Sequence, residues 1–293
     1  MAASLFVAGR GRVGRSLARA LRQAGHPTRL VAARGGARRL VKALSSEPRA
    51  IVFTAVPDGA VAVYAREIAA ASGTTVPDSV TFVHVSGSLG LDALGALAHR
   101  HDVGSFHPLR SFPRPQPPAA FQNIVVAVDA SSPALAQRLE RVARDLGARP
   151  RLVAGADRML YHAAAVFASN YGVALLEVAA GLLEAIGWSE KQAVAGLLPL
   201  MRGAVEEAGR IGIAGALTGP VRRGDASTIE QHLVALQRLD GGASGPPVID
   251  LYRMLGSIAV EIAKEAGLGP AAAERVNRAL TRKVAATRRR RRQ

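Results

Sequence analysis

A glycine-rich turn near the start of the chain limits its possible folds more than any other feature. A short apolar run at residues 4–8 leads into GRGRVG at residues 9–14, which has the spacing GxGxxG and opens a segment of helical periodicity. In strand–turn–helix units with this spacing, the first glycine allows a tight turn, the second lets phosphates approach the backbone, and the third permits close helix packing. Gly9, Gly11 and Gly14 therefore predict a dinucleotide site at a helix N-terminus, with a purely structural turn as the alternative.

Short apolar runs alternate with helical patterns over the first half of the chain. Continuous apolar strands joined by helices are typical of a mostly parallel sheet covered on both faces, so we predict a doubly wound α/β Rossmann domain over residues 1–155. The segment 107–118 contains five prolines and is predicted to be an irregular loop. The expected strands are residues 4–8, 29–33, 50–56, 80–86, 123–128 and 149–153.

The second half of the chain has a different pattern, because strand-like runs end and long helical stretches replace them. We predict an all-α domain over residues 156–287 and a basic tail at 288–293. The most apolar stretch, 161–183, contains His162, Asn170 and Glu177, so we expect a buried core helix and no membrane span. The expected helices are residues 157–186, 189–209, 226–238, 248–266 and 270–287.

Composition narrows the chemistry. The chain has no cysteine, which excludes disulfides, thiolate metal sites and a cysteine nucleophile, and no His and carboxylate spacing predicts a metal site. Its net charge of +16 comes almost entirely from arginine. We attribute this excess to a coding bias and do not expect nucleic-acid binding as a function. We expect a cytoplasmic protein.

The residue after the second expected strand bears on cofactor choice. An NAD site has Asp or Glu about 20 residues beyond the glycine motif, where it accepts a hydrogen bond from the ribose 2′-hydroxyl. This chain has Arg34 there, followed by two glycines. A guanidinium binds a 2′-phosphate well, so Arg34 predicts NADP. The alternative is an exposed helix start in an arginine-rich protein.

Two further strand ends are expected at the same edge of the sheet, where ligands bind in open α/β folds. Val56 and Pro57 follow one strand, and Ser86 and Gly87 follow the next. They are either cofactor contacts or ordinary turn residues. The predicted cofactor contacts are Gly9, Gly11, Arg12, Val13, Gly14, Arg34, Val56, Pro57, Ser86 and Gly87.

Several strings carry a resemblance to a known family. Ser86 with Gly87, SFHPLRSFP at 105–113, YHAAAVFASNY at 161–171 and LTGPVRRGDASTIEQHL at 217–233 resemble the Rossmann-like and DUF2520 domain-containing family. That family lies in the superfamily of 6-phosphogluconate dehydrogenase, ketopantoate reductase, pyrroline-5-carboxylate reductase and prephenate dehydrogenase. The resemblance implies a Rossmann domain, a helical domain, an NADP-dependent reductase of the ketopantoate reductase kind and a homodimer built by the helical halves.

In that superfamily, the first long helix of the second domain carries polar residues into the cleft. Here this helix offers His162 and Asn170, about 80° apart around a regular helix. His162 is the predicted general acid for reduction of a 2-oxo acid, and Asn170 the predicted stabiliser of the developing alkoxide. The alternative is a core histidine and an interhelical asparagine.

The predicted substrate contacts come from three segments. Ser86 and His107 are expected near the nicotinamide, although His107 also fits a role in tying down the proline-rich loop. The 217–228 loop supplies Thr218 and Arg223, and the family string places an arginine directly before the Gly-Asp pair, which favours Arg223 over Arg222 for a substrate carboxylate. Asp225 is expected to cap the next helix together with Thr228.

Three functions remain open on the sequence. The leading hypothesis is a reductase of small 2-oxo acids that acts with NADP on CH–OH groups. The second is an imine reductase of the pyrroline-5-carboxylate reductase type, which needs no strong acid because its substrate carries a labile proton. The third is a non-catalytic, dimeric NADP-binding module.

Overall fold

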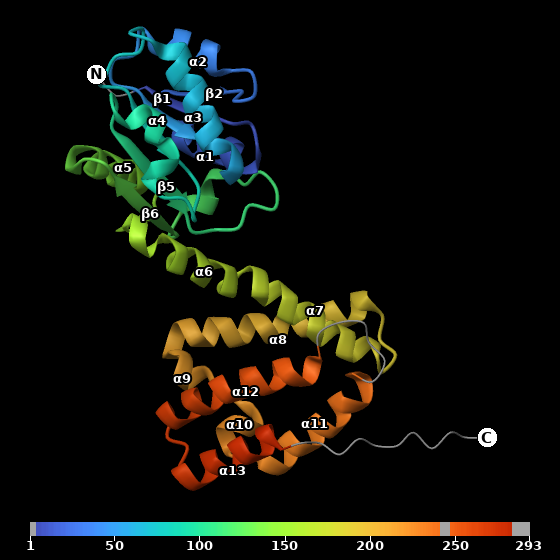
Figure 1. The fold of residues 1–293 in the computed structure, drawn as a ribbon. Coiled ribbons are helices and arrows are strands. Elements are labelled where there is room, and N and C mark those ends of the chain that lie inside the picture. The colour runs from blue at the N-terminus through green and yellow to red at the C-terminus, as the bar shows by residue number, and fades with distance from the viewer. Residues whose placement is uncertain (1–3, 241–246, 283–293) are drawn as a thin grey trace. The chain divides into compact units, whose positions relative to one another are not determined.

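Seven strands form one sheet in the first part of the chain. The computed structural model describes residues 4–240 and 247–282 and divides the chain into two compact units, residues 1–171 and 172–293 (Figure 1). The strand order is β2-β1-β3-β4-β5-β6-β7, and all neighbours are parallel except β5 and β6. The strands are β1 (Leu5–Ala8), β2 (Thr28–Val31), β3 (Ile51–Thr54), β4 (Thr81–His84), β5 (Val103–Pro108), β6 (Val125–Ala130) and β7 (Arg149–Leu152).

Helices connect most of these strands and cover both faces of the sheet. Along β1, Leu5 and Val7 join one buried cluster while Phe6 and Ala8 join the other, as the period of two in a strand requires. The predicted doubly wound Rossmann domain is confirmed. Its helices are α1 (Arg12–Gln23), α2 (Ala37–Leu44), α3 (Asp58–Ser72), α4 (Gly95–Ala98), α5 (Pro133–Asp145) and α6 (Arg158–Ala168).

The chain runs from β1 outward to β2 and then returns to β3 on the other side of β1. This reversal separates the loops at the carboxyl ends of β1 and β3. Ligands of open α/β sheets bind at such a switch point. The glycine motif therefore lies at the edge of the sheet where the fold favours a ligand.

One strand was missing from the sequence prediction. β5 places His107 and Pro108 in the sheet, so the prediction that the irregular loop begins at residue 107 was wrong. Its sequence VGSFHP has no continuous apolar run, which is why the pattern concealed it. Pro108 is tolerated because it ends the strand.

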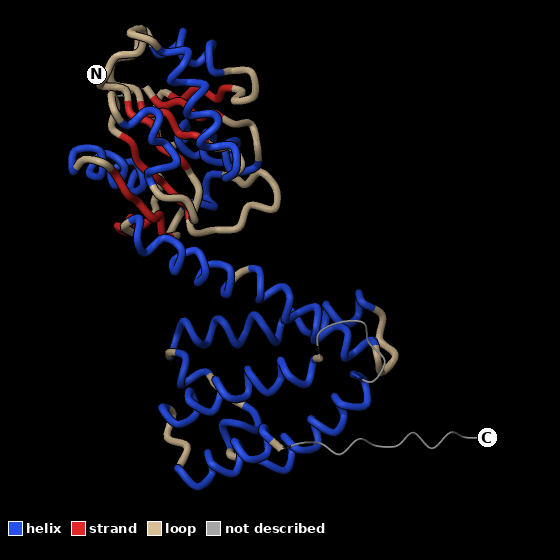
Figure 2. Tube along the Cα trace, viewed as in Figure 1, coloured by secondary structure: helices blue, strands red, loops and turns tan. Residues whose placement is uncertain are grey.

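Among the residues that the structure describes, the second unit consists of helices joined by loops and contains no strand (Figure 2). Its core lies among the last three helices and includes Ile229, Leu233, Val260 and Val276. The basic tail predicted at 288–293 lies outside the described residues. The helices are α7 (Asn170–Glu184), which starts two residues before the unit boundary, α8 (Glu190–Ile211), α9 (Ile213–Ala216), α10 (Gly219–Arg223), α11 (Ala226–Asp240), α12 (Val248–Glu265) and α13 (Pro270–Thr281).

The apolar stretch 161–183 differs from its prediction in two ways. It forms two helices, because the φ and ψ of Ser169, −111° and −67°, depart from helical values between α6 and α7. It is also largely exposed, with Phe167 and Val173 each at 69%, so the expected buried core helix was wrong. By length and composition alone, Gly155–Glu184 is long and apolar enough to cross a membrane, a criterion that core helices of soluble proteins also meet.

Candidate functional site

The glycine turn has the three features that a dinucleotide needs. Gly9 has φ +131°, and a Cβ on it would overlap the Ala55 carbonyl oxygen. A Cβ on Gly14 would overlap the Gly9 carbonyl oxygen, whereas a Cβ on Gly11 would meet no atom within 4 Å. The first and third glycines thus hold the turn closed, while the second leaves open space beside the backbone. The residues present fit a dinucleotide pyrophosphate.

The N-terminus of α1 is electrostatically suited to the same group. Gly11 is its N-cap, so no side chain caps the first turn, and that turn contains no acidic residue. The unpaired N–H groups of a helix start, together with the helix dipole, attract a negative charge. Val13 is half-buried, while Arg12 is exposed. Arg12 directs its Nη1 to the Pro113 carbonyl at 3.1 Å.

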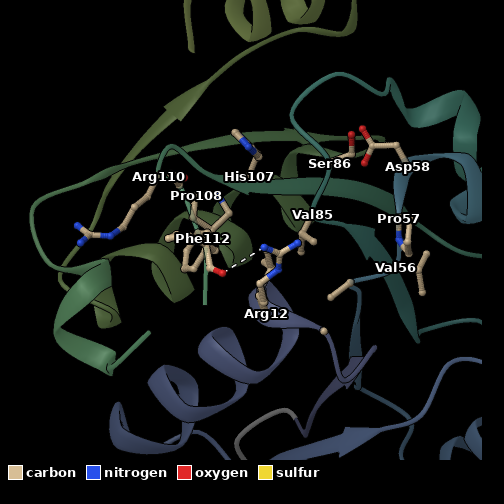
Figure 3. A pocket seen from close by; sticks show the side chains of 15 residues that line it. Arg12, Val56, Pro57, Asp58, Val85, Ser86, His107, Pro108, Arg110 and Phe112 are labelled. Carbon is tan, nitrogen blue, oxygen red and sulfur yellow. Dashed lines mark hydrogen bonds between the residues drawn. The ribbon is translucent and has the colours of Figure 1, made fainter. Parts of the chain in front are cut away.

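A cleft of about 640 Å³ opens from this turn (Figure 3). It is lined by residues 11–13, 55–58, 85–86, 107–108 and 110–113. These segments follow β1, β3, β4 and β5 at their carboxyl ends or close the strand itself. Figure 3 shows Arg12 on the side of the glycine turn, with His107 and Ser86 across the cleft from it. The structure thus brings together the predicted Gly11, Arg12, Val13, Val56, Pro57, Ser86 and His107.

The proline-rich segment after β5 forms one wall of the cleft. Ser16 ties it to α1, because its Oγ donates to the Arg12 carbonyl at 2.6 Å and accepts from the Gln116 N–H at 2.8 Å. The bond from Arg12 to Pro113 holds the same segment near the glycine turn. This segment and the phosphate-facing turn therefore form one hydrogen-bonded unit.

Ser86 organises the turn after β4. Its Oγ accepts from the backbone N–H groups of Ser88 and Leu89, each at 3.2 Å. Ser88 in turn donates to Asp58 Oδ2 at 2.9 Å, which links the turn to the first residue of α3. The Ser86 hydroxyl thus fixes the local backbone and still lines the cleft.

His107 is held by the first helix after the sheet. Its Nδ1 lies 2.7 Å from the Tyr161 hydroxyl. An ideal Cβ on Gly87 would lie 2.8 Å from His107 Nε2 and 3.0 Å from His162 Nδ1, so both imidazoles crowd the Gly87 backbone. His107 lines the cleft, whereas His162 does not. The Nδ1 of His162 is buried without a hydrogen-bond partner among the described residues.

Arg158 lies behind Ser86 and close to His107. Its side chain has no exposed surface, and its Nη1 donates to the Ser86 carbonyl at 3.1 Å. Burial, and then the Arg158 charge, lower the pKa of His107 to about 4, and the same two causes lower the pKa of His84 to about 4. Burial raises the pKa of Tyr161 to about 12. His84 and His107 are therefore neutral near pH 7.

Other predicted residues lie elsewhere. Arg34 is exposed on the turn after β2, outside the lining of the cleft and with no hydrogen bond to any described residue. Asn170 is exposed at the first residue of α7, and the break at Ser169 removes the regular helix on which its position relative to His162 was predicted. Thr218 and Arg223 are exposed in the second unit, so both stay predictions.

The 217–228 segment is more helical than predicted, because Gly219–Arg223 forms the short helix α10. Arg222 donates to the Ala266 carbonyl at 2.7 Å, which gives it a structural role. Asp225 accepts from the Thr228 N–H at 3.1 Å and from its hydroxyl at 2.6 Å, so the predicted cap is confirmed.

Sequence reasoning missed His84, Arg158 and Tyr161. His84 was read only as part of a strand, and Arg158 as one more arginine. The sequence signal that could have indicated this cluster was the pair of family strings at 105–113 and 161–171. They contain His107 and His162, which lie on segments that pack together in the structure. Within the described residues, no cluster of His and carboxylates is arranged to hold a metal ion.

Comparisons with known proteins give a family match and a fold. Residues 124–259 match the family model described as a domain of unknown function, DUF2520. A search of curated protein sequences gives no match. The predicted resemblance to DUF2520 is therefore confirmed over these residues, and the match begins before residue 156, where that domain was predicted to start.

Solved structures give the fold. A Bacteroides fragilis protein described as a candidate NADP oxidoreductase is 25% identical, with a TM-score of 0.66 over 90% of this chain and 98% of its own. A Thermotoga maritima protein is 22% identical, with a TM-score of 0.67 over 89% and 98%. The NADP-bound pyrroline carboxylate reductase of Plasmodium falciparum is 13% identical, with a TM-score of 0.52 over 95% and 98%. This chain has an NAD(P)-binding, oxidoreductase-like fold.

Proposed function

We propose that this chain is an NADP-dependent oxidoreductase that reduces a small 2-oxo acid to the hydroxy acid. One observation carries the proposal. A single cleft joins the open glycine turn at Gly11 to the imidazole of His107. A cofactor held at its pyrophosphate by that turn and a substrate oxygen beside a proton-carrying group thus share one space.

The chain's own residues define where the cofactor would be held. The backbone N–H groups at the start of α1 would bind the pyrophosphate, with Arg12 beside them. Val56, Pro57, Ser86 and Gly87 would wall the nicotinamide, and Arg34 would bind the 2′-phosphate. The bound nicotinamide would supply hydride. Arg34 favours NADP because its exposed guanidinium has no partner among the described residues.

The remaining chemistry is delivery of a proton to the reduced oxygen. Neutral His107 can donate a hydrogen bond from Nε2 when the Tyr161 hydroxyl donates to Nδ1, so Tyr161 would fix the tautomer. His162 stays the proposed general acid, since its Nδ1 is free of partners and lies beside Gly87. Asn170, Thr218 and Arg223 stay proposed contacts of the alkoxide and the substrate.

A turnover screen that follows NADPH absorbance tests the function. Reduction of 2-oxo acids, ketopantoate first, but not of cyclic imines is the expected result. Reduction of imines alone would favour an imine reductase. Binding of NADPH with no turnover of either class would favour a non-catalytic NADP-binding module.

A substitution at His162 tests the acid. His162→Gln should keep the fold and the affinity for NADPH, while turnover falls by about 10² to 10⁴, the usual contribution of a positioned acid or base. His99→Gln, at an exposed position outside the cleft, is the matched control and should leave turnover unchanged. Loss of thermal stability with normal turnover of the folded fraction would make His162 a core residue.

The proposal includes a cytoplasmic homodimer whose subunits meet through the helical unit. Exposed apolar side chains on α7 and α8, such as Val173 and Leu200, support the dimer. A helix that is apolar around its circumference is stable in water only when something covers it.

A further inference from the structure

The first unit contains a buried charge that forms no salt bridge with any described residue. Arg158 has no exposed surface, and its Nε and Nη2 have no hydrogen-bond partner among the described residues. No carboxylate forms an ion pair with it there, although Asp129 is close enough to favour its charged form electrostatically. Buried charges in proteins are normally paired, because an unpaired one loses its hydration without compensation. Among the described residues, the guanidinium therefore has no carboxylate in ion-pair contact, and Asp129 acts on it only at longer range.

The groups around Arg158 do not provide that partner. Its Nη1 is bound to the Ser86 carbonyl, and both Ser86 and His107 line the cleft. His84 Nδ1 and His162 Nδ1 are also buried without partners in the described chain. The charge of Arg158 and its unpaired Nε–H and Nη2–H groups thus lie directly behind one wall of the cleft. An anion in the cleft at that wall would satisfy them.

We propose that a carboxylate of the ligand binds at the Ser86–His107 wall and supplies the negative charge that the buried Arg158 lacks. His107 contacts the anion, and Arg158 acts through its charge and through the Ser86 carbonyl as a positioning residue. The inference rests on the proposed function in its choice of a 2-oxo acid. It assigns the carboxylate to the first unit, whereas the sequence favoured Arg223.

Such a site binds protons together with the anion. The groups that face His107 are Arg158, His162 and Tyr161 from α6, His84 from β4 and Asp58 from α3. A carboxylate placed there raises the pKa of His107 from about 4, because an opposite charge nearby shifts a pKa by roughly 1 to 3. A rise of about 2 makes the anion bind about tenfold more tightly at pH 5 than at pH 8.

The test uses oxamate, a non-reducible mimic of a 2-oxo acid, and its uncharged ester ethyl oxamate. Titration calorimetry on the full chain, with and without NADP⁺, measures both from pH 5 to pH 8. Oxamate should bind with the tenfold pH dependence, and ethyl oxamate should bind more weakly and without it. His107→Asn should abolish the pH dependence, while His99→Asn, the exposed control, should keep it.

Arg158→Met keeps the apolar stem and removes the charge. Oxamate should bind this variant about tenfold more weakly even at pH 8, where His107 is neutral. The reason is that the variant removes the Arg158 charge, which attracts the bound carboxylate from a moderate distance. Should this variant fail to fold, His107→Asn and the ester decide the matter.

The inference is overturned when ethyl oxamate binds as well as oxamate, when oxamate does not bind, or when the pH dependence survives in His107→Asn. Reduction of 2-oxo acids alongside any of these results leaves the proposed function standing without this site. Oxamate binding with the expected pH dependence, but no turnover of any 2-oxo acid, leaves the anion site standing without the function.

Discussion

The sheet unit and the helical unit bury apolar surface in different ways. In the sheet unit every residue of β1, β3 and β4 is buried, with helices on both faces. In the helical unit α11, α12 and α13 enclose a small core, whereas Val173 of α7 and Leu200 of α8 are 69% and 70% exposed. Both regions are apolar in sequence. The difference shows that an apolar sequence pattern predicts burial of the side chains. It does not show whether the same chain or another molecule buries them.

The sheet unit therefore completes its core within one chain, and the helical unit is expected to complete its surface with a second copy. This contrast predicts that changes on α7 and α8 alter assembly, while changes in the sheet unit alter stability and cofactor binding without altering assembly.

The largest effect is expected at the exposed apolar face. Val173→Glu combined with Leu200→Glu should turn a homodimer into a monomer, because each charge is buried twice in a two-fold interface. We expect the dissociation constant to rise by about a thousandfold or more, at roughly 2 kcal/mol per anchor residue. Sedimentation measures it, with Lys191→Glu as an exposed control on the same helix. A wild-type monomer at micromolar concentration would contradict the dimer.

The glycine turn gives the next largest effect and should leave assembly alone. Gly14→Ala places a Cβ against the Gly9 carbonyl oxygen and should destabilise the sheet unit by about 3 kcal/mol, the upper range for overpacking. Gly11→Ala is the matched control for stability, since its Cβ meets open space, but it should weaken NADPH binding. Thermal unfolding and NADPH titration separate the two. Equal loss of stability in both variants would contradict the three separate glycine roles.

Cofactor preference gives a smaller effect, confined to the sheet unit. The wild-type chain should bind NADPH more tightly than NADH, and Arg34→Ala should narrow that gap by on the order of 1.5 to 3 kcal/mol, the value of a hydrogen bond to a charged group. Fluorescence titration with both cofactors measures the gap. Equal wild-type affinities would reject the preference for NADP.

The smallest effect is expected at the start of α11 in the helical unit. Hydrogen bonds from the Thr228 side chain and backbone hold the pKa of Asp225 below its usual 3.8, so this carboxylate stabilises the fold above that pH and loses its contribution as the pH falls through its lowered pKa. Asp225→Ala should lower the melting temperature at pH 7 and lower it less at pH 2. A difference of the same size at both pH values would contradict the charged cap. Ser227→Ala is the neighbouring exposed control.

Much of the fold was predictable because local sequence and global fold agree. β1, β3 and β4 are buried on both faces, so their runs are continuous and apolar, and the glycine motif marks the turn that follows β1. β5 was missed because it contains Gly104, Ser105 and His107, which interrupt the apolar pattern of a strand. These residues are accommodated by their neighbours in the folded sheet, which the sequence pattern does not show. The exposure of α7 escaped prediction because periodicity reports apolarity alone.

The site was predictable only in part. Gly11 and Ser86 stand out because each follows an expected strand at one edge of the sheet, whereas His107 was predicted from the proline-rich loop and the family string at 105–113. Arg158 and His107 are far apart in sequence, and only the docking of α6 against the sheet brings them together. Arg158 also resembles the other arginines of the chain until its burial is known.

The turn that carries Arg34 has a consequence for how cofactor choice can change. Gly35 has φ +63°, and a Cβ on Gly36 would overlap the Ala32 carbonyl oxygen, so two glycines set the backbone of this turn. The Arg34 side chain is exposed and forms no hydrogen bond with any described residue. The backbone of this turn is thus fixed by its glycines, while the side chain at position 34 can be replaced without disturbing it. The single substitution Arg34→Asp would offer the ribose a carboxylate in place of a guanidinium, and the backbone of the turn would stay the same.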